Sequence, residues 1–435
     1  MSILSRTTLV GIVALALLGC SREERLEGTR VDLRAPWGGG AVTENRSAPV
    51  ALGAQAVNSA WTQRQGTSGA RPQHPALSDT PQLVWSTPIG AGDSRRARLT
   101  TDPVAADGRI FTLDAAARVQ ATSTDGAVLW SADITPARGQ RASASGGALA
   151  VGGGRVFVAS AFAVLVALDA STGREIWRAD FTSPLTGSPA VQGDAVYVSE
   201  IDNTMWSLDA ATGRIQWSLP GTATLSTVAR GSAPAIAGDL VVFPSQAGEL
   251  VAVRRSNGGQ IWNSAASGRR TGAALSSISA LTGDPVISGN RLYAANQSGR
   301  IVALDTATGA TIWSAQEAAY GPVWPVGDAV FLVSDENRLL RMNAADGAVV
   351  WAQELPLYTT ERVRRRLAVY PQHGPILAGG RLWVASGDGV LRGFDPASGA
   401  RTTEIAIPGG AASGPIVVGR TLYILGREGV LHAYR

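Results

Sequence analysis

The sequence predicts an all-β protein, an eight-bladed β-propeller of four-stranded antiparallel blades that is closed by an N-terminal strand completing the last blade. Two interleaved repeats and one missing strand lead to this prediction. A length of 435 residues would by itself allow two or three domains. The repeats instead continue from about residue 82 to the end of the sequence, so they indicate one ring.

The first repeat reads as a strand, a tight turn and a second strand that carries a tryptophan. In the copy LVALDASTGREIW, the apolar run up to Leu168 alternates as in a half-buried strand. Asp169 can bond its own backbone to open the turn, and Gly173 can adopt the positive φ that the turn needs. We expect Trp177 and its equivalents to fill the joints between units. The other copies start at Arg118, Met205, Leu250, Ile301, Leu339 and Leu391, and Thr403 takes the tryptophan place in the last.

The second repeat lies upstream of the first and consists of a proline, an apolar pair, a turn and an apolar strand. Two of its eight copies are DPVAADGRIFTL from Asp102 and DPVISGNRLYA from Asp284. The other six start at Gly146 (where the proline is missing), Ser188, Ala233, Gly321, Gly374 and Gly414. Joined, the two repeats give four short strands with a period of roughly 40–50 residues, which is typical of a propeller blade.

The eighth unit is incomplete, because the chain ends at Arg435 where the other copies have their turn aspartate. A spare strand of the missing type, PQLVWSTPI, starts at Pro81 and carries Trp85 in the repeat phase. We expect this strand to complete the last blade, which leaves no free sheet edge between the first and last blades.

Ahead of the ring domain, residues 80–435, the sequence predicts two further segments. Residues 1–19 read as a secretory signal, with Arg6 before an apolar run that is too short to span a bilayer. Residues 20–79 are rich in Gly, Ala, Ser, Arg and Gln without sustained periodicity, so we expect a flexible and mostly disordered tether. Within it, Trp61 either packs on the propeller rim or anchors a partner.

Composition and motifs give no sign of catalysis. The formal charge of +4 is mild and does not by itself indicate nucleic acid. His74, His373 and His432 fall in different units, whereas a zinc site needs more ligands at closer spacing. The repeated D-x-x-T-G turns lack the run of carboxylates of a calcium loop, so their aspartates read as turn formers. We therefore expect no metal and no cofactor.

The connections between blades vary in length and emerge on one face, whereas the D-x-x-T-G turns on the opposite face are uniform. Long variable loops on a rigid scaffold are where binding usually resides. These loops gather a set of arginines: Arg95, Arg96, Arg98, Arg269, Arg270, Arg364, Arg365 and Arg366. They form either a basic rim for an acidic partner or lipid head groups, or a solvated face balanced by Asp93 and Glu361.

Two motifs resemble those of known families. Leu17-Leu18-Gly19-Cys20 is similar to the box of bacterial lipoproteins, in which the cysteine becomes the lipidated first residue. Cys20 is the only cysteine in the chain. The residue after it is Ser21 rather than an aspartate, which by resemblance to lipoprotein sorting implies the outer membrane. The repeat D-x-x-T-G-x-x-x-W resembles the tryptophan-docking repeat of pyrroloquinoline quinone (PQQ) propellers. Together with the signal, the box and the closing strand, it resembles the BamB family over essentially the whole chain.

This resemblance implies a non-enzymatic scaffold of the β-barrel assembly (BAM) machinery, anchored by lipid to the periplasmic face of the outer membrane. The implied partners are the POTRA domains of BamA, other subunits of that complex and unfolded barrel proteins, with no nucleic acid. The protein by itself is expected to be a monomer without a cofactor.

The family's contact residues carry over only in part. Arg230 and Gly231 stand before a Ser-Ala-Pro strand start, as the family pattern requires. Leu225 and Val228 are substitutes for the leucines of the family, and Asp284 stands alone where the family has two aspartates. These five residues are the predicted partner-binding set.

Two other functions remain open from the sequence. A quinoprotein dehydrogenase would bind PQQ and Ca²⁺ in the central channel, but this chain is shorter and lacks the adjacent cysteines that many such enzymes carry. The second alternative is a propeller lipoprotein that binds another envelope component or a glycan.

Overall fold

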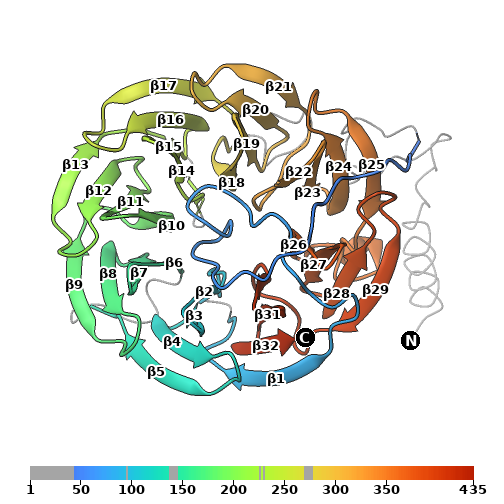
Figure 1. Cartoon of the computed structure of the whole chain (residues 1–435), viewed down its shortest axis with the longest axis horizontal. Helices are drawn as coiled ribbons and strands as arrows, with labels where there is room; N and C mark the ends of the chain where they lie inside the picture. The colour runs from blue at the N-terminus through green and yellow to red at the C-terminus, as the bar shows by residue number, and fades with distance from the viewer. Residues whose placement is uncertain (1–43, 95–96, 137–145, 225–226, 229–230, 269–277) are drawn as a thin grey trace, which may run out of the picture. The chain divides into compact units, whose positions relative to one another are not determined.

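The ring is formed by eight four-stranded antiparallel sheets, so the predicted fold class is confirmed (Figure 1). The computed structural model describes residues 44–94, 97–136, 146–224, 227–228, 231–268 and 278–435. In every blade the strand nearest the channel comes first in the chain and the fourth strand forms the outer edge, except in blade 8.

Blade 1 consists of β2 (Val104–Ala106), β3 (Arg109–Leu113), β4 (Arg118–Ser123) and β5 (Val128–Asp133). Blade 2 consists of β6 (Gly147–Gly152), β7 (Arg155–Ser160), β8 (Val164–Asp169) and β9 (Glu175–Asp180). Blade 3 consists of β10 (Leu185–Gln192), β11 (Ala195–Glu200), β12 (Met205–Asp209) and β13 (Ile215–Leu219). Blade 4 consists of β14 (Ala235–Ala237), β15 (Leu240–Pro244), β16 (Glu249–Arg254) and β17 (Gln260–Ala265).

Blade 5 consists of β18 (Leu281–Ser288), β19 (Arg291–Asn296), β20 (Ile301–Asp305) and β21 (Thr311–Ala315). Blade 6 consists of β22 (Trp324–Val326), β23 (Ala329–Val333), β24 (Arg338–Asn343) and β25 (Val349–Glu354), and is followed by the 3₁₀ turn η2 (Val363–Arg365). Blade 7 consists of β26 (Gln372–Ala378), β27 (Arg381–Ser386), β28 (Val390–Phe394) and β29 (Arg401–Ala406). Blade 8 consists of β30 (Ile416–Val418), β31 (Thr421–Gly426), β32 (Val430–Tyr434) and β1 (Leu83–Pro88).

The ring closes as the sequence predicts. β1 pairs antiparallel with β32, with Thr87 opposite Leu431, and forms the outer strand of blade 8. The closing strand also supplies the tryptophan of the joint between blades 8 and 1, because the indole nitrogen of Trp85 donates to the carbonyl of Thr124 at 3.1 Å. The first and last parts of the ring domain are therefore held by one sheet.

A tryptophan fills each of seven joints, which confirms the role expected for these residues. Each indole N–H donates to a turn carbonyl of the following blade, at 2.8–3.3 Å, from Trp85, Trp130, Trp177, Trp217, Trp262, Trp313 and Trp351. The repeat glycine serves the tryptophan of the preceding blade: a Cβ on Gly213 would lie 2.6 Å from the ring of Trp177. At the eighth joint, the hydroxyl of Tyr434 donates to the carbonyl of Ala406 at 2.9 Å.

The turn aspartates also act as predicted. One carboxylate oxygen of Asp169 accepts bonds from the backbone N–H and hydroxyl groups of Ser171 and Thr172, at 2.6–3.0 Å. The same arrangement recurs at Asp209, Asp305 and, with serine in place of threonine, Asp395. These bonds close the turn and leave the glycine of each copy at a positive φ, such as 74° at Gly173.

The strand directions give the ring two different faces. The connections between blades and the turns between second and third strands share one face, here called the loop face. The turns between first and second strands and the D-x-x-T-G turns share the other, here called the turn face. Apolar clusters fill the joints between blades, as in the cluster shared by blades 1 and 2 around Phe111 and Val166.

The chain ahead of the ring domain runs through the central channel and makes one full circuit of it (Figure 1, blue). This channel segment, residues 58–75, contacts the first strand or first turn of every blade in the order 8, 1, 2, 3, 4, 5, 6 and 7. The contacting residues are Asn58, Trp61, Thr62, Gln63, Gln65 with Ser68, Gly69, Arg71, and His74 with Pro75. The strand edges that line the channel thus obtain hydrogen-bond partners from the chain itself.

The prediction of a flexible tether is therefore wrong for residues 44–79, while residues 20–43 lie outside the described residues. The composition of this segment shows few apolar residues. It does not show that the polar residues of the segment bond to backbone groups of the inner strands. Trp61 does pack, as one of the two alternatives held, but in the channel and not on the rim. Its side chain is fully buried, pairs by its backbone with Ala105 and lies 6.3 Å from the ring of Trp324.

Candidate partner-binding face

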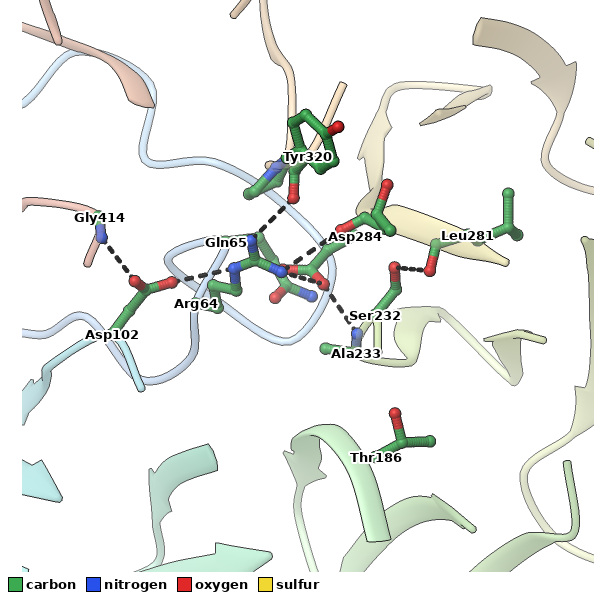
Figure 2. A network of polar contacts seen from close by, with 12 residues as sticks. Arg64, Gln65, Asp102, Thr186, Ser232, Ala233, Leu281, Asp284, Tyr320 and Gly414 are labelled. Carbon is green, nitrogen blue, oxygen red and sulfur yellow. Dashed lines mark hydrogen bonds and ion pairs between the residues drawn. The ribbon is translucent and has the colours of Figure 1, made fainter. Parts of the chain in front are cut away.

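A buried arginine of the channel segment ties opposite sides of the ring together (Figure 2). Nε of Arg64 lies 2.9 Å from a carboxylate oxygen of Asp102, at the start of blade 1, and Nη1 lies 3.2 Å from one of Asp284, in blade 5. Nη2 donates to the carbonyl of Tyr320 at 3.0 Å. Since blades 1 and 5 are four blades apart in a ring of eight, these two ion pairs span the channel.

Both carboxylates extend the network to further blades. Asp102 accepts the backbone N–H of Gly414, before blade 8, at 2.6 Å, and Asp284 accepts that of Ala233, before blade 4, at 2.8 Å. Burial alone would lower the pKa of Arg64, but the charges of Asp284 and Asp102 outweigh it and raise the pKa above its ordinary value. Arg64 therefore stays charged and fixes the entrances of blades 1, 4, 5 and 8.

Arg71 is a second guanidinium of the channel segment; it is partly buried and bonds to neutral groups. It donates to the carbonyls of Val323 at 3.1 Å and Pro322 at 2.7 Å, and its guanidinium carbon lies 4.8 Å from the centre of the Trp324 ring. Burial lowers the pKa of Arg71 to about 9. The negative charge of Asp284 raises this pKa only in part, and the positive charge of Arg64 lowers it further.

A cavity of about 530 Å³ lies above these arginines on the loop face. Its floor is formed by Arg64 and Arg71, and its walls come from the loop-face ends of blades 5 to 8 together with Asp102 and Val228. The channel segment thus contributes two arginines to the floor of this cavity, which is open to solvent on the loop face and is here called the bowl.

The predicted partner-binding residues fall at and beside this bowl. Val228 lines it, and its backbone N–H donates to the side chain of Gln246 at 2.9 Å. Gly231 packs against Thr186, because a Cβ at position 231 would lie 1.8 Å from the Thr186 hydroxyl. Leu225 and Arg230 lie outside the described residues.

Asp284 lies beneath this face instead of on its surface. Only 1% of the residue is exposed, and one carboxylate oxygen carries both the Arg64 ion pair and the Ala233 bond. A direct contact between this carboxylate and a partner, as the sequence suggested, does not fit its burial. Asp284 instead holds the segment that leads from Gly231 into blade 4.

The arginines predicted on the loop face are described in part. Arg98 is 55% exposed and lies 3.6 Å from Asp93, so Asp93 does balance some of this charge as one alternative held. Arg364 and Arg365 lie in η2 and are exposed, while Arg366 stacks over Tyr358 at 4.9 Å. Arg95, Arg96, Arg269 and Arg270 lie outside the described residues.

Arg64 and its partners were missed from the sequence, although a signal for part of the network was present. Of the eight copies of the proline repeat, two begin with Asp-Pro where the others carry a small residue, and these are Asp102 and Asp284. Charged residues at a position that faces the channel predict a cation between them. Nothing in the sequence around Arg64 marks it as that cation.

Among the residues that the structure describes, no group of three or more His, Cys, Asp and Glu side chains could hold a metal ion. His74 is engaged in the channel, between the carbonyl of Gly53 and the backbone N–H of Gly380. His432 is a strand residue of β32 and lies 2.8 Å from the hydroxyl of Ser86. No helix in the described ranges is long and apolar enough to cross a membrane.

Comparison of the sequence with known families gives a consistent match. A family model described as outer membrane protein assembly factor BamB matches residues 115–353, more than half of the chain. The BamB of Salmonella typhimurium is 30% identical over 364 residues, which cover 81% of this chain and 88% of that protein. The BamB of Xanthomonas campestris is 35% identical over 245 residues, covering 55% of this chain and 59% of that protein.

Solved structures share the fold at lower identity. The crystal structure of BamB from Moraxella catarrhalis aligns with a TM-score of 0.67 at 18% identity, covering 82% of this chain and all of that one. Quinohemoprotein alcohol dehydrogenase from Comamonas testosteroni aligns with a TM-score of 0.63 at 15% identity, covering 87% and 81%. These likenesses show the propeller fold, whereas the sequence matches are specific. The chain belongs to the family of outer membrane protein assembly factors known as BamB.

Proposed function

We propose that this protein is a non-catalytic scaffold of the outer-membrane β-barrel assembly machinery, and that its loop face binds the POTRA domains of BamA. The observation that carries the proposal is the sequence match to a named assembly factor over 81% of the chain. The bowl and the fixed segment at Gly231 lie on the face where the family's contact pattern falls, which supports the choice of face. Other BAM subunits and unfolded barrel proteins are the further partners.

The contents of the channel support a scaffold rather than an enzyme. The channel, where a quinoprotein dehydrogenase would hold PQQ and Ca²⁺, is filled here by residues 58–75. The carboxylates of Asp102 and Asp284 are turned to Arg64 and pair with it. These residues do not fit a quinone and a divalent cation at the same place, because both the space and the anionic ligands are already taken.

The location follows from the N-terminal motifs. We propose that residues 1–19 are removed, that Cys20 carries the lipid, and that the ring stands on the periplasmic side of the outer membrane. More than one acyl chain is needed for durable attachment, since a single chain binds only marginally. Mass spectrometry of the mature protein tests the anchor, and an unmodified Cys20 would contradict it.

The experiment that tests the proposal is an affinity purification of the lipoprotein from detergent-solubilised envelopes, with identification of the proteins that accompany it. BamA and other BAM subunits are the expected companions. Arg230→Glu should weaken the recovery of BamA at least tenfold without lowering the melting temperature, because it reverses a charge in the predicted contact loop. Arg174→Glu on the turn face is the matched control, since Arg174 is exposed there.

A second variant tests the loop through its shape and leaves its charge unchanged. Gly231→Ala places a Cβ against the Thr186 hydroxyl and displaces the loop, so BamA recovery should fall while the ring stays folded. Full recovery of BamA with both Arg230→Glu and Gly231→Ala would refute the assigned face. Absence of BamA with the unaltered protein would refute the proposed function itself.

A further inference from the structure

The bowl on the loop face has apolar walls. Above the arginine floor, its sides include Tyr320, Val333, Leu357, Val369 and Ile376, from the connections and strands of blades 5 to 7. A volume of about 530 Å³ is within the range of sites that take a small ligand or one or two side chains. An apolar group that enters this space would therefore contact these apolar side chains and lose part of its contact with water.

Two polar atoms in the wall have no hydrogen-bond partner. Nε2 of Gln297, in the turn between β19 and β20, and Oε1 of Gln372, at the start of β26, are both buried and unpaired. The whole Gln297 residue is only 8% exposed. Buried polar groups are normally paired, and a rotation of these two side chains towards the bowl would let a ligand that offers both a donor and an acceptor satisfy them. A peptide group does so, with its C=O and its N–H.

Exposed apolar side chains lie in the wall of the bowl, at Tyr320 and Val369, and further along the loop that carries Val369. Tyr320 is 43% exposed, and on the loop between blades 6 and 7 Val363, Leu367 and Val369 are 58%, 85% and 52% exposed. Elsewhere in the described residues, the large apolar side chains with similar exposure are Val57 and those on the outermost strands. Apolar groups concentrated beside a cavity, and away from the edges of the sheets, are typical of an interaction site.

The loop that carries them, residues 357–370 and here called the arginine loop, has a fixed base. The side chain of Asn337 donates to the carbonyls of Pro356 and Tyr370 at 3.0 and 2.9 Å, and that of Gln372 donates to Pro356 at 2.9 Å. Its tip holds four arginines, at 362, 364, 365 and 366, against the single acid Glu361. The tip of the arginine loop therefore attracts negative charge.

We propose that the bowl and the arginine loop bind an acidic, extended peptide segment of a protein partner, which inserts one apolar side chain into the bowl. The peptide backbone at the inserted residue pairs with Gln297 and Gln372, and flanking carboxylates face Arg362, Arg364 and Arg365. An anionic membrane surface would use the same arginines, but it would use neither the cavity nor the two amides. The proposal stands independently of the BamA assignment.

The test measures binding of labelled heptapeptides to the full lipoprotein in detergent, by fluorescence anisotropy. The probe is Gly-Glu-Glu-Leu-Glu-Glu-Gly, and the comparison peptides replace either the four glutamates by lysine or the leucine by glycine. The probe should bind at least tenfold more tightly than either. Equal binding of the three peptides, or binding of none, would overturn the proposal.

Variants of one residue separate filling of the bowl from damage to the ring. A Cβ on Gly321, which lines the bowl, meets only the carbonyl of Gly374, at 3.6 Å. Gly321→Ala is therefore the control and should bind the probe within twofold of the unaltered protein. Gly321→Leu fills the space and should weaken binding at least tenfold. Unchanged binding with Gly321→Leu would contradict insertion into the bowl.

Two exposed positions keep the test valid if Gly321→Leu fails to fold. Leu367→Asp and the pair Arg364→Glu with Arg365→Glu lie at the loop tip and should each weaken the probe at least tenfold while leaving the melting temperature unchanged. The same variants are then mixed with phosphatidylglycerol vesicles. The proposal would be overturned if the Arg364→Glu, Arg365→Glu variant lost binding to the vesicles but kept binding to the probe peptide. The arginine loop would then be a lipid-binding surface.

Discussion

The outside and the centre of the ring are held together in opposite ways. At the outer joints one apolar arrangement, a tryptophan against a glycine turn, recurs seven times with the same hydrogen bond. At the centre a single segment meets eight blades with different residues, and its key contact is a buried ion network around Arg64. Repetition thus builds the ring, and one aperiodic segment fixes its blades from within.

The physical difference lies in what happens when a part is removed. Each outer joint is independent of the others, so a lost tryptophan leaves a local cavity. The central network is shared, so a lost Arg64 leaves the carboxylates of Asp102 and Asp284 buried without their cation. The comparison therefore predicts that changes at the centre affect several blades at once.

Removal of residues 44–78 should give the largest effect, because it takes away Trp61 and Arg64 together. Loss of a buried tryptophan and of a buried ion-pair partner each cost about 3–5 kcal/mol, so the free energy of unfolding should fall by more than about 5 kcal/mol. Urea unfolding followed by tryptophan fluorescence measures this. Addition of residues 44–78 as a separate peptide should restore part of the loss, and an unchanged midpoint would contradict the central role of the segment.

Arg64→Ala should have the next largest effect, a loss of about 3–5 kcal/mol in the free energy of unfolding, because two buried carboxylates lose their cation. The matched control is Arg401→Ala. Arg401 lies 2.7 Å from Glu404, but both side chains are about half exposed, so the expected change is about 0–1 kcal/mol. Similar losses for the two variants in urea titrations would show that burial does not distinguish the centre from the surface.

The outside of the ring was predictable from the sequence because its physics is local and repeated. The spacing of Gly173 and Trp177 recurs in most blades, so strands, turns and the tryptophan joints follow from one pattern. The closing strand followed from counting, since the last unit lacked a strand and Trp85 stood in phase. The direction of packing did not follow, because the glycine of each repeat contacts the tryptophan of the blade before it.

The centre was not predictable in the same way. The channel segment bonds chiefly through backbone groups and single polar side chains, and these leave no periodic pattern in a sequence. Gly231 and Val228, which a family pattern picks out, stay predicted contact residues, whereas Asp284 is buried against Arg64 and does not face a partner. Gln297 and Gln372 gave no signal, because what distinguishes them is an unpaired atom in a three-dimensional wall.

Gly213→Ala tests the packing at a single outer joint and should cost less than the central changes. Gly213 has a φ of 73°, and the added Cβ would lie 2.6 Å from Trp177, so strain and crowding combine to about 1–3 kcal/mol. Gly193→Ala is matched, since its φ is 65° and no atom lies within 4 Å of the added Cβ. It should show only the backbone part, about 1 kcal/mol. If Gly213→Ala and Gly193→Ala lose the same free energy of unfolding in urea, crowding against Trp177 does not contribute to the loss.

The smallest effect concerns the charge of the turn aspartates, and it appears only in acid. Hydrogen bonds from Ser171 and Thr172 lower the pKa of Asp169 to about 2, and bonds from Thr212 and Thr308 lower those of Asp209 and Asp305. In the unfolded chain an aspartate has a pKa of about 3.9. Because the pKa is lower in the folded state, the stabilisation is fully present above about pH 4 and is lost as the pH falls towards 2.

Blade 6 supplies the control for this last effect, because Asn343 occupies the same turn position and its side-chain oxygen accepts the backbone N–H of Ala345 at 2.9 Å. Asparagine therefore fits the turn without a titrating charge. The triple variant Asp169→Asn, Asp209→Asn and Asp305→Asn should lose less of its melting temperature between pH 4 and pH 2 than the unaltered protein does. If the melting temperatures of the two proteins fall equally between pH 4 and pH 2, these carboxylates are not responsible for the acid sensitivity of the outer turns. The next groups to neutralise are then Asp102 and Asp284, which pair with Arg64 at the centre.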